Sequence, residues 1–294
     1  MTLRSGEIYV TEQNSSYIIP ETISLFGLTI SFYGLLLVVA ALIGIIVIAE
    51  ATRRKKQNAE WNLTLITLLI LSALLGGRLY YVLFEWEKFA AEPLALINLR
   101  SGGLSYFGAL FGAWSAVKLY CRKKDGDFLQ SADTLCLGAA AAAPWIWCGC
   151  AFVREPLGKF YDGLFAVRIG AEYIGESTER AGSVLMQRIS GKQYISVHPV
   201  AVYGIVFSVL IFILLCAYMF YVKRKGAVFT AYLVMNSVVM AVLEAFRADS
   251  YYVWGTTIPV NYIVSGVILF TIAFTWIRRL ISAKRSKYKV FMES

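Results

Sequence analysis

Long apolar segments alternate with short polar ones along most of the chain. Seven apolar runs are each close to the roughly 20 residues that an α-helix needs to cross a bilayer. They cover residues 27–49, 62–84, 104–120, 128–153, 199–222, 227–246 and 257–278. The third run is short, at residues 104–120. This pattern predicts an all-α polytopic membrane protein with seven transmembrane helices, which form a single integral membrane domain over residues 1–294.

The fourth run, SADTLCLGAAAAAPWIWCGCAFV, is rich in small residues. Small side chains let neighbouring helices approach closely inside a membrane. Pro144 lies within this run, and proline lacks the N–H group that a helix interior uses. We therefore expect the fourth helix to be kinked or interrupted, with an irregular outer end where it lines a cavity.

Basic clusters follow every second apolar run. Arg53–Lys56, Arg122–Lys124, Lys223–Lys225 and Arg278–Arg279 follow the first, third, fifth and seventh runs. Because cytoplasmic loops carry an excess of Lys and Arg, this predicts an N-out, C-in topology. Residues 1–22 are then an extracytoplasmic N-terminal segment that lacks the apolar core of a cleaved signal peptide, and residues 280–294 are a cytoplasmic tail.

The segment between the fourth and fifth runs, residues 154–198, is therefore expected to be extracytoplasmic. Its stretches AVRIGAEYIGES and KQYISV alternate apolar and polar residues, with glycines between them. This alternation is typical of short β-strands. We predict a small β-containing cap, which acts either as a lid over a site or as a plain tether between two helices.

Composition supports the membrane assignment and excludes several functions. The chain is 58% hydrophobic and 16% charged, whereas soluble domains are about half apolar and about a quarter charged. Its net charge of +9 is divided among short clusters, so we expect no nucleic-acid partner. The five cysteines are Cys121, Cys136, Cys148, Cys150 and Cys216. Most lie in or beside apolar runs, so we expect neither a disulfide framework nor a metal site or cofactor.

Four ionisable residues lie near the outer ends of apolar runs, at Arg78, Glu155, Glu244 and Arg247. Ionisable groups inside a membrane are costly and often functional. At one depth they can form a pocket for an anionic headgroup, because a guanidinium binds two phosphate oxygens at once. The alternative is that Arg78–Glu155 or Glu244–Arg247 are structural ion pairs, and the spacing of three puts Glu244 and Arg247 on one helix face.

His198 is the only histidine, and it lies just before the fifth run in SVHPVAVYG. An isolated histidine is more often structural than catalytic. However, its ordinary pKa lies near neutrality, so it is the first candidate for a general base. Tyr33 lies in the first run, and Tyr80, Tyr81 and Tyr106 are expected in the same outer half, where aromatic residues commonly gather at the membrane interface.

Several of these residues belong to an ordered series of motifs. They are FYG, GGRLYYVLF, RSGGLSYFGALFG, FLQSADTL, HPVAVY and LEAFRAD, spread over the first six runs. The series resembles the bacterial prolipoprotein diacylglyceryl transferase family over about residues 23–280. The resemblance implies a multi-pass protein of the bacterial plasma (inner) membrane with its active side extracytoplasmic. Such proteins transfer the diacylglyceryl group of phosphatidylglycerol to the lipobox cysteine thiol of a prolipoprotein signal peptide, and glycerol 1-phosphate leaves.

The resemblance implies two groups of site residues. His198, Arg247 and Glu244 are expected to be catalytic. The expected substrate-binding residues are Arg78, Tyr33, Ser105, Arg154 and Glu155. Arg154 is not itself a family residue, but it brings a new guanidinium next to Glu155.

The chain departs from the family pattern at several motif positions. Phe107 replaces the histidine of the third-run motif, Trp147 and Met240 replace arginines, and Gly204 replaces a glutamate. The other departures are Ala109, Cys150, Val153, Arg154 and Ala201. Losing one electrostatic contact to a transition state typically costs about 10²–10³ in rate, so these departures bear on activity.

Two functions therefore remain open at this point. One is a divergent transferase that acts on an anionic lipid and a cysteine thiol or related acceptor. The other is a non-catalytic relative that binds phospholipid or a lipoprotein signal peptide as an accessory protein. A solute transporter is disfavoured, because the in-run charges lie near the outer interface and not in the cytoplasmic half.

Overall fold

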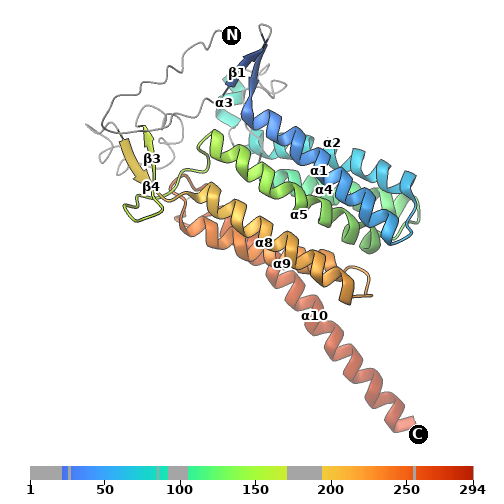
Figure 1. Ribbon diagram of the computed structural model, residues 1–294. Helices are drawn as coiled ribbons and strands as arrows, with labels where there is room; N and C mark the ends of the chain where they lie inside the picture. Colours follow the sequence, from blue (N-terminus) through green and yellow to red (C-terminus); the bar gives the residue numbers. More distant parts are fainter. Residues whose placement is uncertain are drawn as a thin grey trace. The chain divides into compact units, whose positions relative to one another are not determined.

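The computed structural model describes residues 22–25, 28–84, 86–91, 105–170, 194–253 and 256–293 (Figure 1). Its helices are α1 (Phe32–Arg54), α2 (Ala59–Phe84), α3 (Trp86–Ala91), α4 (Tyr106–Lys123), α5 (Phe128–Phe152), α8 (Val200–Tyr221), α9 (Ala227–Ala245) and α10 (Val260–Glu293). Two antiparallel strand pairs join β1 (Thr22–Leu25) to β2 (Leu28–Ser31) and β3 (Val167–Gly170) to β4 (Tyr194–Val197).

Six helices in the described ranges are long and apolar enough to cross a membrane. They are α1, α2, α5, α8, α9 and residues 260–279 of α10. The prediction of a helical multi-pass membrane protein is thereby confirmed. The predicted third span corresponds to α4, which is helical but is not among the six and carries Lys118, Arg122 and Lys123. The orientation of the helices across the membrane stays a prediction.

Three boundaries differ from the expectation. The first predicted span began at residue 27, but Leu28–Ser31 form strand β2, and α1 begins at Phe32. The alternating sequence LTIS pairs with TISL to make a hairpin. These residues therefore form a strand, although they are apolar enough to extend the helix. Pro144 does not interrupt α5, which is helical from Phe128 to Phe152. Membrane helices tolerate proline because nearby groups can satisfy the backbone groups that it frees. In addition, α10 continues well beyond its apolar part, to Glu293.

The described chain forms two compact units. Unit 1 takes its residues from the ranges 1–43, 139–222 and 230–294, and unit 2 from 44–138 and 223–229. The boundary falls inside α1 and α5, so each of these helices contributes to both units. The prediction of a single membrane domain is not tested by this division. The two units are described separately below.

Unit 2 is built on a close crossing of α2 and α4. A Cβ atom added to Gly112 would lie 2.3 Å from the Ser72 carbonyl oxygen, and one added to Gly108 would lie 2.4 Å from the Gly76 oxygen. Only glycine permits backbones to approach this closely. The core beside this crossing includes Leu65, which is fully buried.

The cap of unit 1 contains the predicted β-structure. Strands β3 and β4 pair in the register Val167 to Val197, as the alternation in both stretches indicated. Leu157, Ile169, Ile195 and Val197 form a small apolar core beneath them. The described part of residues 154–198 therefore has an apolar core of its own, and its role as a lid or as a tether stays a prediction.

Candidate active site

Glu244 and Arg247 are paired at the end of α9. The helix ends at Ala245, and the chain then turns, with the Arg247 N–H donating to the Glu244 carbonyl over 3.2 Å. The Arg247 Nη1 and Glu244 Oε2 atoms lie 3.5 Å apart. The predicted ion pair is confirmed, although a tight turn brings the two side chains together rather than a continuous helix face.

Asp249 is a second partner of Arg247, and the sequence interpretation missed it. The Arg247 Nε–H donates to Asp249 Oδ1 over 3.1 Å, while Asp249 Oδ2 accepts from the Leu157 N–H over 3.1 Å. This buried carboxylate thus connects the guanidinium to the beginning of the cap. Burial opposes the charge of Arg247, but Asp249 and then Glu244 outweigh it and raise the pKa of the guanidinium. The aspartate two residues after the arginine was the available signal, in the motif LEAFRAD.

Glu244 is the most deeply buried acidic group of this cluster, with 1% of its side chain exposed. Its Oε2 atom accepts a short hydrogen bond from the Asn261 amide at the start of α10. Its Oε1 atom is buried and has no hydrogen-bond partner among the described residues. A buried carboxylate oxygen of this kind is costly to leave without a hydrogen bond.

Main-chain hydrogen bonds attach the cap to Arg247. The Lys159 N–H donates to the Phe246 carbonyl and the Ala248 N–H to the Leu157 carbonyl, both over 2.8 Å, so Gly158 and Arg247 form an isolated bridge. Gly158 lies so close to His198 that an added Cβ atom would be 2.1 Å from the His198 carbonyl oxygen. A larger residue at position 158 would therefore displace either Arg247 or His198.

His198 borders the same Gly158–Lys159 segment, because its N–H donates to the Lys159 carbonyl over 2.9 Å. Its imidazole stacks on Tyr161, with ring centroids 4.1 Å apart, and its Nδ1 atom lies 3.3 Å from the Tyr203 hydroxyl. The Phe246 ring is 5.0 Å away. Burial and then the charge of Lys159 lower the pKa of His198, which favours the neutral imidazole that can accept a proton.

Tyr33 at the start of α1 lies near Glu155 after the end of α5, and Arg154 precedes Glu155 in the chain. Tyr33 packs on Gly149, where an added Cβ atom would be 2.9 Å from the tyrosine ring. The tyrosine hydroxyl is close enough to Glu155 for the charge of that carboxylate to act on it. In the same unit, the charges of Glu155 and Arg247 both act on Cys150. The structure therefore brings most of the predicted site residues of unit 1 to one end of its helices.

Arg78 and Ser105 belong to unit 2 and are described there. Arg78 is buried, and its guanidinium lies over the Phe89 ring at 5.1 Å from the centroid. Ser105 is the N-cap of α4, and its hydroxyl accepts from the Gly108 N–H at 3.4 Å. Phe107 lies in the first turn of that helix. Gly102 and Gly103, which precede the cap in the motif, lie outside the described residues.

Comparison with known proteins agrees with this architecture. A sequence model of the family described as prolipoprotein diacylglyceryl transferase matches residues 20–278. The chain belongs to this family. It is 27% identical over 252 residues to a phosphatidylglycerol–prolipoprotein diacylglyceryl transferase of Finegoldia magna, covering 84% of this chain and 92% of that protein. A protein of the same name from Clostridioides difficile is 28% identical over 77% of this chain and 82% of its own.

Two departures from the family pattern are neighbours in this member. Trp147 of α5 lies against Gly204 of α8, and a Cβ atom added to Gly204 would be 2.2 Å from the Trp147 ring. The family resemblance predicted an arginine at the first position and a glutamate at the second. Here tryptophan and glycine occupy these positions. The Trp147 indole lies where a side chain at position 204 would be.

A third departure is explained by the end of α5. Arg154 has a φ of 56°, in the left-handed region that favours glycine. The Glu155 N–H donates to the Cys150 carbonyl over 3.1 Å, which is the hydrogen bond of a Schellman C-cap. Arg154 therefore occupies the left-handed position of this cap, where the family resemblance predicted glycine. This backbone conformation costs arginine about 1 kcal/mol relative to glycine.

Proposed function

We propose that this chain transfers the diacylglyceryl group of phosphatidylglycerol to a prolipoprotein cysteine, the activity for which its relatives are named. The observation that carries the proposal is the cluster at the end of α9. There a single arginine lies between two carboxylates, one of which keeps a buried oxygen without a partner in the described structure. The cluster lies beside a cap that contributes a neutral histidine.

Arg247 is proposed to hold the lipid phosphate. Its contacts with Asp249 and Glu244 use the Nε–H group and one N–H group of each Nη atom. A guanidinium has more N–H donors than these contacts require, so both Nη atoms can still donate to phosphate oxygens. The same donors would stabilise the charge that develops on the departing phosphate.

The reaction replaces one bond of the lipid glycerol. The cysteine sulfur attacks the glycerol carbon that bears the phosphate, an S–C bond forms, and the C–O bond to the phosphate breaks. Glycerol 1-phosphate leaves with the bonding electron pair. The thiol proton must go to a base, since the thiolate is the nucleophile. We assign that role to His198, which the Tyr203 hydroxyl and the Tyr161 ring hold in place.

The remaining predicted residues of unit 1 are proposed to bind substrate around this centre. Tyr33, Arg154 and Glu155 would contact the headgroup or the peptide, and Glu244 Oε1 would accept a hydrogen bond from either. Arg78 and Ser105, which belong to unit 2, stay predicted substrate-binding residues. We further propose that the reacting side is extracytoplasmic, in the bacterial plasma membrane, because the charge pattern places the cap there.

The decisive experiment measures transfer of radiolabelled diacylglycerol from phosphatidylglycerol to a lipobox peptide by the purified full-length protein. We expect a lipidated peptide and equimolar glycerol 1-phosphate. A peptide whose cysteine is replaced by serine is the control and should remain unmodified. Retained binding of phosphatidylglycerol without any transfer would contradict the proposal.

That outcome would support a second candidate, an accessory protein that binds phospholipid or signal peptide. The Trp147–Gly204 contact favours it, because two charged positions of the family pattern are apolar here. Binding of the lipobox peptide and of lipid is then expected to be independent of His198. If the wild type transfers, the His198→Gln variant should abolish transfer and leave binding of both ligands intact. An accessory protein would bind both ligands without transfer in the wild type and the variant alike.

A further inference from the structure

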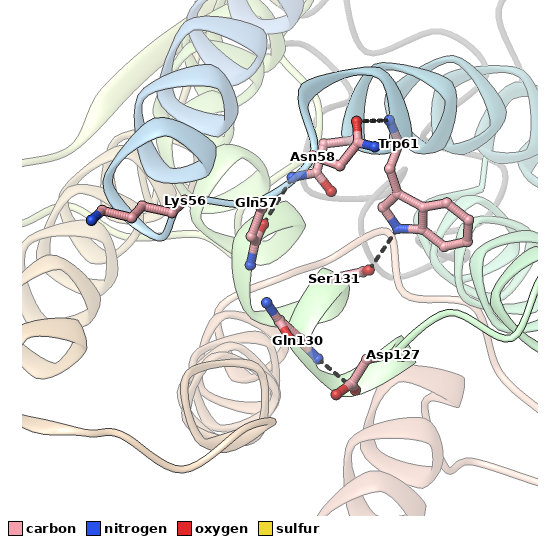
Figure 2. A pocket seen from close by; sticks show the side chains of 8 residues that line it. Lys56, Gln57, Asn58, Trp61, Asp127, Gln130 and Ser131 are labelled. Atoms are coloured by element: carbon pink, nitrogen blue, oxygen red, sulfur yellow. Dashed lines mark hydrogen bonds between the residues drawn. The ribbon is translucent and has the colours of Figure 1, made fainter.

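A polar pocket of about 280 Å³ lies within unit 2, and none of its lining residues is assigned to transfer (Figure 2). It is formed by the turn after α1, the first residues of α2 and the start of α5. Ligand pockets in proteins start at about 300 Å³, so this one is the size of a lipid headgroup or a similar small molecule. Nothing in the proposed transfer reaction uses it.

The lining of the pocket is unusual for a chain that is 58% hydrophobic. Half of its eight lining side chains are carboxamides, at Gln57, Asn58, Asn62 and Gln130. In Figure 2 the amide ends of Gln57 and Gln130 point toward one another. Trp61 adds an aromatic wall. Carboxamides next to an aromatic ring are suited to a ligand with several hydroxyl groups, because they can both donate and accept hydrogen bonds.

The direction of the hydrogen bonds below the pocket is determined by Thr52. Its hydroxyl donates to the Ile48 carbonyl over 2.7 Å, so it can only accept from Asn62. Asn62 Nδ2 therefore donates both to Thr52 Oγ1 and to Gln57 Oε1, each over 2.8 Å. The Thr134 hydroxyl also donates to Gln57 Oε1, over 3.0 Å. Flipping either amide would break this chain of bonds.

This arrangement leaves one acceptor and one donor without partners among the described residues. They are Asn62 Oδ1 and Gln57 Nε2, both buried, on two residues that line the pocket. Asn62 as a whole is 2% exposed. An unpaired buried polar group costs about 1–3 kcal/mol. A hydroxyl group is the complement of this pair, since it can donate to the Asn62 oxygen and accept from the Gln57 nitrogen.

The charges around the pocket favour an anion. Lys56 is one of the lining residues, although in Figure 2 its ammonium points away from the other lining side chains. Asp127, a second lining residue, is already paired with Lys225 over 2.6 Å. The hydrogen bond from Lys225 holds the pKa of Asp127 below its usual range, so this carboxylate remains an ionised partner of lysine. The three basic loops of the chain, at residues 53–56, 122–124 and 223–225, all belong to unit 2.

We infer that this pocket binds a glycerophosphoryl group, with a glycerol hydroxyl between Asn62 and Gln57. The phosphate would be bound by Lys56 once its flexible side chain turns toward the pocket. A headgroup of phosphatidylglycerol in the bilayer and free glycerol phosphate both offer this chemistry. The inference does not rest on the proposed transfer reaction, because its residues are separate from the cluster at Arg247. It adds a second, non-catalytic site for a hydroxylated anionic ligand.

The test uses native mass spectrometry of the full-length protein in detergent, with added phosphatidylglycerol or phosphatidic acid. Phosphatidic acid has the phosphate but no glycerol headgroup. The variant Lys56→Ala/Gln130→Ala removes two lining groups that support no other part of the network described above. Lys124→Ala, in another basic loop and outside the pocket, is the matched control. Soluble glycerol 3-phosphate is added as a competitor to distinguish a lipid headgroup from the free compound.

We expect the pocket variant to bind phosphatidylglycerol about tenfold more weakly than the wild type, the loss of one hydrogen bond to a charged group. The control should be unaffected, and phosphatidic acid should bind more weakly than phosphatidylglycerol to the wild type. Competition by glycerol 3-phosphate at matched concentration would identify the free compound as the ligand, and its failure to compete would identify the lipid. Equal binding of both lipids, or a pocket variant that binds like the wild type, would mean that the pocket holds only water and would overturn the inference.

The result can be separated from that of the transfer assay. The pocket variant and Arg247→Ala should each lose one bound phosphatidylglycerol, from different sites. A protein with both changes should therefore lose both bound lipids. Transfer activity of Lys56→Ala/Gln130→Ala should stay at the wild-type level. If the wild type shows no transfer while the pocket variant still loses phosphatidylglycerol, the proposed function fails and the second site stands.

Discussion

Two contacts within unit 1 differ in whether charged or apolar side chains form them. At the end of α9, Arg247 keeps a carboxylate on each side, and Asp249 joins it to the cap. Between α5 and α8, Trp147 lies on Gly204, at two positions where the family resemblance predicted an arginine and a glutamate. The first contact is a network of charged groups, and the second is an apolar ring packed against a glycine.

The difference shows that unit 1 uses both charged networks and apolar packing between its elements. Breaking a buried ion pair by removing one partner typically costs about 3–5 kcal/mol, whereas replacing both by a well-packed apolar pair is often neutral. Trp147 with Gly204 is an apolar contact, because the ring occupies the volume that a longer side chain at 204 would need. The predictions below test each contact in turn.

Removing the central charge should have the largest effect. Arg247→Ala is expected to lower kcat/KM for diacylglyceryl transfer by about 10²–10³, the usual cost of losing one preorganised electrostatic contact. Arg247→Lys is the matched variant, which keeps the charge but loses the planar pair of donors. It should recover only part of the activity. If Arg247→Ala transfers at the wild-type rate, the network at the end of α9 has no role in the reaction.

Asp249 should matter through Arg247 rather than by contact with substrate. Asp249→Asn keeps the size of the side chain but removes the charge that orients the Arg247 Nε–H. We expect kcat/KM to fall by about 10–100-fold, the range found for groups that orient a functional side chain. The loss should appear mainly in KM for phosphatidylglycerol, if Arg247 binds the ground-state phosphate. Asp249→Glu should restore part of it, whereas a purely structural role would reduce the folded fraction of all variants alike.

The sequence predicted most of the architecture, because its signal was strong. Apolar runs locate helices well, and the strand alternation in residues 166–177 and 192–197 predicted the β3–β4 pair. The β1–β2 hairpin was missed, since its residues are apolar enough to be read as part of a span. The hydrogen bond between Leu157 and Asp249 and the Trp147–Gly204 contact could not be predicted from spacing. Both depend on residues about 57–92 positions apart in the chain, and no local period encodes such contacts.

The apolar contact should respond to volume. Gly204→Ala adds a methyl group where the Trp147 ring already lies, so we expect a loss of about 1–3 kcal/mol in the free energy of unfolding in detergent. The double variant Trp147→Phe/Gly204→Ala should lose less than the sum of its parts, because the smaller ring makes room. Gly266→Ala is the control, since no atom lies within 4 Å of an added Cβ there. Additive losses would show that the two positions do not share a packing contact.

The smallest expected effect concerns the pH dependence of stability at His198. Burial and the charge of Lys159 lower its pKa in the folded protein, so the unfolded chain binds a proton more readily. The stabilising contribution is complete above the ordinary histidine pKa of about 6.5 and is lost as the pH falls toward the folded value. Thermal unfolding in detergent should therefore show a Tm that falls between about pH 7 and pH 5, and the fall should be shallower in His198→Gln. An identical slope in both proteins would place the titrating group elsewhere, and would weaken the assignment of His198 as a neutral base beside the charged network.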